Sequence, residues 1–286
     1  MVFVTTSAVA TFEEHRRYLR SLAYRMLGSV AEAEDIVQEA FLRWQNAEPD
    51  ALLVPRAWLS TVVVRLCLDV QKSARTRYET YVGPWLPEPL ATAAEPTDRE
   101  SISLAFLVLL ESLSPAERGA YLLHEVFDYS FAEVAGILDK EEATCRQLCH
   151  RAREHVTRRR PRFAPSRAAH ERLLQTFLQA VTLGDLAGLQ HVLAEDVTAY
   201  SDGGGKVRAA RRLVHGADAV ARLFMGAARK NPLAPDAEVS LVDVNGWPAF
   251  VVRQAGRATI MLGIETDGEH IYGVHFIVNP DKLARL

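Results

Sequence analysis

Arginine, glutamine and histidine side chains recur along one side of the segment from Thr144 to Arg162. At helical spacing, an apolar stripe (Cys145, Leu148, Cys149, Ala152 and Val156) faces away from Arg146, Gln147, His150 and Arg153. Arginine and glutamine pair bidentately with guanine and adenine edges in the major groove. The segment holds seven arginines and one acid, Glu154, in a chain whose net charge is −3. The pattern predicts a DNA-reading helix; a solvated basic helix face is the alternative.

A second helix precedes this one. Ser130 and Glu133 form the S-x-x-E pattern of a capping box, and Asp139-Lys140 interrupts the apolar run that follows, so a helix-turn-helix is expected. Ser114 and Glu117, with Pro115 between them, predict another helix start of the same kind.

Composition limits the class of protein. The 286 residues are enough for two domains or three small ones, and the 49% hydrophobic and 24% charged contents are those of a soluble protein. The sequence has no apolar run of the roughly 18 residues that a membrane span needs, and the N-terminus is a poor signal peptide. Three cysteines do not suggest a disulfide framework. We therefore expect a cytoplasmic protein without a membrane segment, a metal site or a cofactor.

Residues 12–77 are predicted to be all-helical. Within AEAEDIVQEAFLRW a polar, largely acidic side, with Glu32, Asp35, Gln38 and Glu39, lies opposite an apolar one. A loop at 46–54 precedes Pro55, which suits the first turn of a long helix whose end carries Lys72, Arg75 and Arg77.

A proline-rich linker follows at 78–97. It contains GPWLPEPL, and an apolar pair such as Trp85 and Leu86 in a linker usually docks on another surface. Helices are expected again from about Asp98, so that 98–163 forms a second all-helical unit.

The pattern changes from Ser166 onward. Helices are expected over 170–182 and 185–193, and strand-like runs follow, among them VTAYSD, KVRAARRLV and IYGVHFIV. Asn245-Gly246 and Asp267-Gly268 predict hairpins. The order predicts an α+β cone in which a curved antiparallel sheet wraps around helices and encloses a pocket for an unknown small ligand.

Taken together, these segments resemble the extracytoplasmic-function (group IV) sigma-70 factors of bacterial RNA polymerase. EDIVQEAFLRW is similar to the family's polymerase-binding helix, PRAWLSTVVVRLCLDVQKSART to its −10 recognition helix, and LSPAERGAYLLHEVFDYSFAEVAGIL with TCRQLCHRAREHV to its −35 reader. The last segment resembles the SnoaL-like domain, of the nuclear-transport-factor-2-like fold, that one subgroup carries. The subgroup is known by WLPEP, DGGGK and NPDKL, all of which are present here, at 85–89, 202–206 and 279–283.

The resemblance implies an alternative sigma factor with no enzymatic activity. Its multidomain fold has two all-α domains, sigma region 2 (1–77) and helix-turn-helix region 4 (98–163), followed by the α+β SnoaL-like domain (166–286). The partners implied are core RNA polymerase and promoter DNA. Core polymerase would be bound by Asp35, Gln38, Glu39 and Arg43. The −10 element would be bound by Arg65, Asp69, Lys72, Arg75 and Arg77, and the −35 element by Thr144, Arg146, Gln147, His150, Arg151 and Arg153.

One position departs from the family. Many of these factors carry a basic residue where Leu148 stands, and Leu148 belongs to the inward stripe here. The base sequence of the −35 element is therefore not predicted.

The SnoaL-like domain has two readings. As an enzyme it would be an isomerase, cyclase or hydratase that uses a carboxylate and a histidine, with candidates His191, His215, His270, His275, Asp202 and Asp243. As a regulatory module, which the resemblance favours, it would tune the sigma factor in cis through three groups of residues: Trp85, Leu86 and Pro87; Asp202, Gly203, Gly204, Gly205 and Lys206; and Asn279, Pro280, Asp281, Lys282 and Leu283. A ligand-sensing helix-turn-helix regulator that binds duplex DNA without the polymerase is the further alternative.

Overall fold

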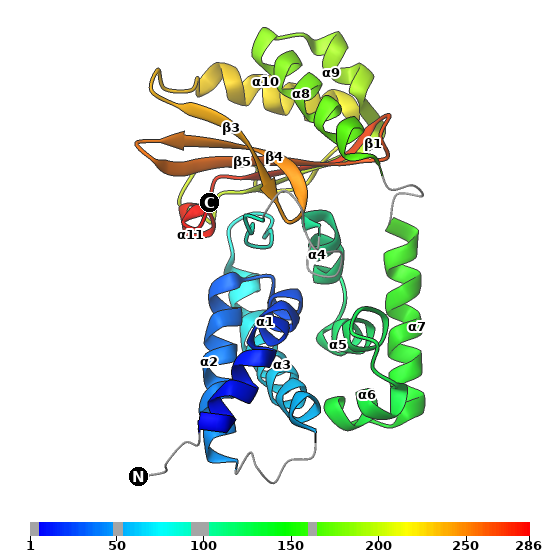
Figure 1. The fold of residues 1–286 in the computed structure, drawn as a ribbon. Coiled ribbons are helices and arrows are strands. Elements are labelled where there is room, and N and C mark those ends of the chain that lie inside the picture. Colours follow the sequence, from blue (N-terminus) through cyan, green and yellow to red (C-terminus); the bar gives the residue numbers. More distant parts are fainter. Residues whose placement is uncertain (1–5, 48–53, 93–102, 160–164) are drawn as a thin grey trace. The chain divides into compact units, whose positions relative to one another are not determined.

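The structure is a computed structural model that describes residues 6–47, 54–92, 103–159 and 165–286 (Figure 1). The chain divides into two compact units. The first comprises Met1–Glu79 and Leu109–Arg159, and the second comprises Thr80–Val108 and Arg160–Leu286. The linker segment that carries WLPEP thus belongs to the same unit as the C-terminal residues.

The first unit is all-helical. It contains α1 (Thr6–Leu27), α2 (Val30–Asn46), α3 (Pro55–Thr80), α5 (Pro115–Tyr121), a π-helical turn η2 (Leu122–Val126), α6 (Phe131–Leu138) and α7 (Glu142–Arg159). The last residue of α3, Thr80, already belongs to the second unit. Helix α4 (Leu104–Glu111) has residues in both units. The boundary between α1 and α2 is local: Gly28 has a φ of 67°, and the Ser29 side chain caps α2 by accepting a bond from the Glu32 amide.

Helices α6 and α7 form the expected helix-turn-helix. Both predicted capping boxes are present, at Ser114 with Glu117 and at Ser130 with Glu133. Asp139 ends α6 in the left-handed conformation, with a φ of 54°. The predicted inward stripe of α7 is fully buried, including the free thiols of Cys145 and Cys149. Packing therefore accounts for both cysteines.

The second unit has the predicted α+β layout. Helices α8 (Arg167–Leu183) and α9 (Leu186–Val192) precede β1 (Leu193–Asp202) and β2 (Val214–His215). Helix α10 (Ala217–Lys230) follows, and then the meander β3 (Glu238–Val244), β4 (Trp247–Gln254), β5 (Arg257–Thr266) and β6 (Ile271–Ile277), with α11 (Pro280–Leu283) last. The six strands form one sheet in the order β2-β1-β6-β5-β4-β3. The layout places the end of β1 beside the end of β6.

Two predictions about the sheet were wrong. The sheet is not wholly antiparallel, because the four-strand meander returns β6 in the same direction as β1, and these two strands pair in parallel. The run KVRAARRLV is not a strand, since only Val214 and His215 pair with β1. Lysine and alanine are disfavoured in strands, and the residues of this run before Val214 form an irregular loop instead.

The hairpin turns follow their sequences. Asn245 and Gly246 have φ values of 53° and 79°, as a type I′ turn requires, which confirms that prediction. Asp267-Gly268 also joins two strands, through a longer turn in which the Asp267 carboxylate accepts bonds from the amides of Glu269 and His270. A third hairpin turn, at Ala255-Gly256, also has positive φ values at both residues. Its first residue is alanine, not the asparagine or aspartate that is typical of such turns.

The two faces of the sheet have separate cores. Leu262 packs with Phe177 and Phe224 of the helices, whereas Met261 packs with Leu86 of the linker. Because neighbouring residues of a strand point to opposite faces, the helices α8–α10 cover one face and the linker covers the other. Aromatic rings fill much of the helix-covered side: Phe224 contacts Phe177 and Phe276 edge to face, with centroids 5.2 and 5.6 Å apart. The predicted ligand pocket stays a prediction.

Candidate nucleic-acid interface and linker-docking site

The six residues predicted to read the −35 element all lie on exposed positions of α7. They are Thr144, Arg146, Gln147, His150, Arg151 and Arg153. Their exposure follows from the buried stripe, which turns the opposite side of the helix to solvent. The helix therefore presents a continuous polar surface.

Two of these six residues pair with glutamates on other elements. Arg153 pairs with Glu125 of η2, and Arg151 lies 3.4 Å from Glu117 of α5. The pKa of the Glu117 carboxyl is lowered mainly by its bond from the Ser114 hydroxyl, and Arg151 adds to this effect. Since these two arginines join α7 to neighbouring elements, they position the helix. Thr144 and Gln147 are exposed and lie on the same side of the helix, one turn apart, which suits contact with bases.

The polar side of α2 is also exposed. Asp35 and Gln38 are solvent-exposed, and Arg43 pairs with Glu39 at 2.8 Å. Leu42, one turn after Gln38, is 46% exposed. Sequence reasoning did not select Leu42, although a leucine on a polar helix side is a signal for a partner surface.

The predicted −10 residues lie on α3. Arg65 donates from Nη2 to the Gly136 carbonyl and from Nε to the Ile137 carbonyl, both at 3.2 Å, near the end of α6. Cationic side chains suit a helix C-terminus, where carbonyl groups lack partners. Asp69 and Lys72 form an exposed ion pair at 2.9 Å. The side chains of Arg75 and Arg77 lie outside the described residues.

Polar contacts that the sequence did not reveal hold the helical unit together. The hydroxyl of Ser60 lies 2.8 Å from that of Tyr129 and 3.3 Å from that of Tyr18, and the Arg56 guanidinium lies over both tyrosine rings. Arg118, buried on α5, donates from Nη1 to the Met26 carbonyl and to Glu111, each at 2.7 Å. These contacts join α1 and α3 to Tyr129, just before α6, and join α1 and α4 to α5.

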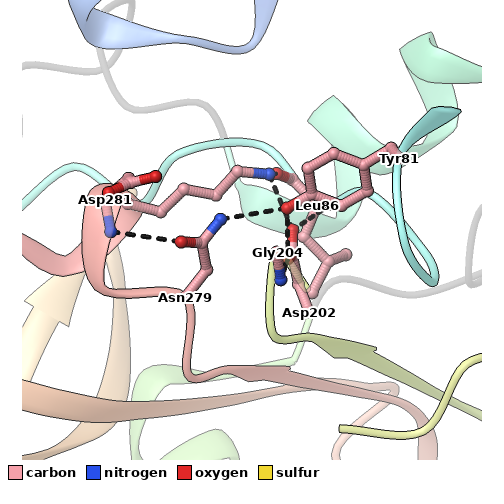
Figure 2. A network of polar contacts seen from close by, with 7 residues as sticks. Tyr81, Leu86, Asp202, Gly204, Asn279 and Asp281 are labelled. Atoms are coloured by element: carbon pink, nitrogen blue, oxygen red, sulfur yellow. Dashed lines mark hydrogen bonds and ion pairs between the residues drawn. The ribbon is translucent and has the colours of Figure 1, made fainter. Parts of the chain in front are cut away.

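Asp202, fully buried at the end of β1, is the centre of the linker-docking site (Figure 2). Its Oδ2 accepts from the Leu86 amide at 2.9 Å and from the Lys282 ammonium at 2.7 Å. Its Oδ1 accepts from the Tyr81 hydroxyl at 2.5 Å and from the Gly204 amide at 3.0 Å. One carboxylate therefore joins the linker, the glycine turn and α11.

The other members of the site complete this arrangement. Lys282 also donates to the Leu86 carbonyl, and its ammonium lies 4.0 Å from the centre of the Trp85 ring. The Asn279 side chain donates from Nδ2 to the Tyr81 hydroxyl at 3.0 Å. Burial and the bond to Asp202 raise the pKa of the Tyr81 hydroxyl, so that it stays a donor well above neutral pH. Tyr81 was missed because it lies outside the WLPEP motif.

The glycine turn fits closely against its neighbours. A Cβ atom at Gly203 would lie 2.1 Å from the Val207 carbonyl oxygen, and one at Gly204 would lie 2.3 Å from the side-chain nitrogen of Asn279. Gly204 has a φ of 60°, so both space and backbone conformation favour glycine there. Lys206, the last residue of DGGGK, forms a solvent-exposed salt bridge with Asp281 at 2.6 Å. DGGGK and NPDKL are thus in direct contact.

The end of the linker pairs with the β3–β4 hairpin. The Leu90 amide donates to the Asn245 side chain at 3.0 Å, and the Asn245 amide donates to the Leu90 carbonyl at 2.8 Å. The Thr92 amide donates to the Asp243 carbonyl at 2.8 Å. Asn245 was selected in the sequence only for its turn, so its role towards the linker is a finding of the structure.

The structure does not gather the six acid–base candidates into one site. His191 on α9, His215 on β2 and His270 in the β5–β6 turn are exposed. Asp202 is committed to the linker, and Asp243 pairs with Arg167. His275 is buried on β6, where its Nε2 has no hydrogen-bond partner among the described residues. The described residues also contain no cluster of three or more His, Cys, Asp or Glu side chains that could hold a metal ion.

A half-buried carboxylate predicts a pH effect on stability. Burial raises the pKa of Glu265 on β5 from 4.5 to about 7, so the unfolded chain releases this proton first, and stability falls as the pH rises between these two values. Burial lowers the pKa of His170 and His275 to about 4, which acts in the opposite direction: the unfolded chain takes up these protons first, and stability falls as the pH drops below about 6.5. A comparison that leaves both histidines in place isolates the carboxylate.

We therefore expect Glu265→Gln to stabilise the C-terminal unit progressively as the pH rises. Relative to wild type, the gain in unfolding free energy should be near zero at pH 4 and reach up to about 3 kcal/mol at pH 8. Urea titrations of both proteins at four pH values measure it. A difference that does not depend on pH would contradict the assignment.

Among the described residues, no helix combines the length and the apolar character that a bilayer-spanning segment needs. Comparison with known proteins places the architecture in a family. The chain matches sigma-70 region 2 over residues 11–77 and sigma-70 region 4 over residues 103–156. It is 44% identical over 227 residues to the ECF RNA polymerase sigma factor SigJ of Mycobacterium tuberculosis, which covers 76% of this chain and 72% of SigJ.

Two further likenesses extend over nearly the whole chain. The probable ECF RNA polymerase sigma factor SigI of the same organism is 34% identical over 286 residues, with 97% of this chain and 95% of SigI covered. The crystal structure of SigJ superposes with a TM-score of 0.76 at 37% identity, covering 96% of this chain and 97% of that one. The chain therefore belongs to the extracytoplasmic-function family of RNA polymerase sigma factors.

Proposed function

We propose that the protein directs core RNA polymerase to specific promoters as an alternative sigma factor, in the cytoplasm and without catalysis of its own. The observation that carries the proposal is the exposed polar side of α7, presented by a complete helix-turn-helix in a chain that belongs to this family. On this side Thr144, Arg146, Gln147 and His150 would contact the −35 element, while Arg151 and Arg153 would position the helix and reach phosphates.

The −10 element would be bound along α3. A melted strand is held by a basic track, which Lys72, Arg75 and Arg77 would provide with Asp69 beside them. Arg65 would join this track only after it leaves the carbonyl groups at the end of α6. Only the contribution of Arg65 to promoter binding would therefore require the α3–α6 contact to open.

Run-off transcription tests the proposal directly. Full-length protein with core polymerase should give promoter-specific transcripts on a promoter library, and the free protein should bind duplex promoter DNA only weakly. Tight binding of the free protein with no transcript would instead indicate a ligand-sensing regulator.

The exposed side of α2 would bind core polymerase. Asp35 and Gln38, with the Glu39–Arg43 pair, supply charge complementarity, and the exposed Leu42 supplies an apolar contact at the centre.

Reversal of charge on α2 should weaken core binding. We expect Asp35→Lys with Glu39→Lys to raise the dissociation constant for core polymerase at least about ten-fold, because like charges would then face the partner. Fluorescence anisotropy of labelled protein measures it. Glu238→Lys with Glu269→Lys makes the same change in net charge at exposed positions of the C-terminal unit and should bind like wild type. Equal affinities of the two double variants for core polymerase would refute the assignment of core binding to α2.

The SnoaL-like domain would tune this activity in cis. Its support is the docking site at Asp202, which holds the linker between the two DNA-binding regions through Tyr81, Leu86 and Lys282. A docked linker has fewer conformations than a free one, so docking would restrict the arrangements that regions 2 and 4 can adopt on a promoter.

A further inference from the structure

The loop between β1 and β2 is strongly basic. Residues 203–213 contain Lys206, Arg208, Arg211 and Arg212 and no aspartate or glutamate, in a chain with a net charge of −3. All four basic side chains are exposed. The regulatory role proposed for the glycine turn uses only the first part of this loop.

The three arginines differ from the other basic residues in their surroundings. Lys206 is neutralised by Asp281, and on α7 Arg146, Arg151, Arg153 and Arg158 each lie near a glutamate. Within the described part of the chain, Arg208, Arg211 and Arg212 take part in no salt bridge and no side-chain hydrogen bond. Their charges are therefore available to an external anion.

The backbone beneath these arginines is held in place. The Gly203 carbonyl accepts bonds from the amides of Lys206 and Val207, both at 3.0 Å. On the other side, a Cβ atom at Gly83 of the linker would lie 3.5 Å from the Ala210 carbonyl oxygen and 3.6 Å from the Arg211 Cα. A loop ordered in advance loses less entropy when it binds, so this one is better suited to a partner than a free basic tail is.

The linker also connects the loop to the helix that is proposed to bind the −10 element. Helix α3 ends at Thr80, and the next residue, Tyr81, bonds to Asp202 at the base of the loop. The sequence of α3 carries Lys72, Arg75 and Arg77 before this point. In the sequence, Arg77 is thus only four residues from Tyr81, which docks at the base of the arginine loop.

We propose that Arg208, Arg211 and Arg212 bind the phosphodiester backbone of promoter DNA next to the −10 element, so that the SnoaL-like domain is itself a DNA-contacting part of the initiation complex. Arginine suits this partner because its guanidinium is always charged and its forked donors match phosphate oxygens. The contact would be independent of base sequence. The inference rests on the proposed sigma function.

Salt dependence of promoter binding is the direct test, with full-length protein assembled on core polymerase and a labelled promoter fragment. Each phosphate contact contributes about 0.9 to the slope of log affinity against log salt concentration. If all three arginines bind phosphates, Arg208→Gln, Arg211→Gln and Arg212→Gln together should lower this slope by about 2.7, and the advantage of wild type should shrink by about 40-fold between 50 and 200 mM salt.

Two matched proteins make the result specific. The combined Arg229→Gln, Lys230→Gln and Arg257→Gln variant removes the same charge at exposed positions elsewhere in the unit and should keep the wild-type slope. Replacing the three loop arginines by lysine keeps the charge and should also keep the slope. Thermal melting of each variant checks that the substitutions have not disturbed the fold.

Other outcomes overturn the inference. One is a loop variant that keeps the wild-type slope and affinity. Another is a loop variant that transcribes less but binds the promoter as well as wild type, which would assign the loop to the polymerase. A wild-type protein that does not bind core polymerase would refute the sigma function, and the inference with it. The two failures are distinguished by the core-binding measurement on wild type.

Discussion

Lys282→Met should lower the free energy of unfolding of the C-terminal unit by about 3–5 kcal/mol, because it leaves the fully buried Asp202 carboxylate without a counter-charge. The Tyr81 hydroxyl and the amides of Leu86 and Gly204 would remain as donors, but none carries a charge. The contact of the ammonium with the Trp85 ring would be lost as well. Urea denaturation followed by tryptophan fluorescence measures the change.

Lys206→Met is the matched control. It removes the same type of side chain from an ion pair in the same unit, but Lys206 and Asp281 are 56% and 63% exposed, so a loss of at most about 1 kcal/mol is expected. Asp202→Asn combined with Lys282→Met should be less damaging than Lys282→Met alone, since no charge then remains buried. A loss below about 1 kcal/mol for Lys282→Met would contradict the central role of Asp202.

The same variants test regulation in cis. If the docked linker tunes the sigma factor, Lys282→Met should change the yield of promoter-specific transcript more than Lys206→Met does. Equal yields from all three proteins at a temperature where each is folded would remove the regulatory proposal and leave the sigma assignment intact.

The second large effect is expected in the helical unit. Arg118→Met should lower its unfolding free energy by about 3–5 kcal/mol, since the Arg118 side chain is 5% exposed and serves both the Met26 carbonyl and Glu111. Far-ultraviolet circular dichroism during urea denaturation measures this. Arg151→Met also removes an arginine paired with a glutamate of the same region, but that arginine is 61% exposed and should cost at most about 1 kcal/mol. Similar losses for the two variants would contradict this account.

Local features of the fold were predictable from the sequence. The capping boxes at Ser114 and Ser130, the buried stripe of α7 and the Asn245-Gly246 turn depend on residues within a few positions of one another. Their geometry follows from hydrogen bonds and backbone preferences that act at short range. For this reason the helix-turn-helix and most strands were placed correctly.

Long-range contacts were not predictable in the same way. Asp202 lies 116 residues after Leu86, and nothing in DGGGK indicates that its carboxylate is buried by the linker. The parallel pairing of β1 with β6 depends on the direction in which the whole meander returns. Likewise, the arginines of α7 predicted an exposed basic helix side, but the sequence did not reveal that Arg151 and Arg153 pair with glutamates on α5 and η2.

The docking site also imposes an order on events during protein synthesis. The Leu86 carbonyl and its partner Lys282 are 196 residues apart in the chain. At about 5–20 residues per second, a ribosome needs roughly 10–40 s to make the stretch between them. Throughout that interval the linker has neither its lysine nor the completed β6, so it emerges undocked. Each newly made molecule therefore passes through a period in which its helical regions can fold before the linker is held.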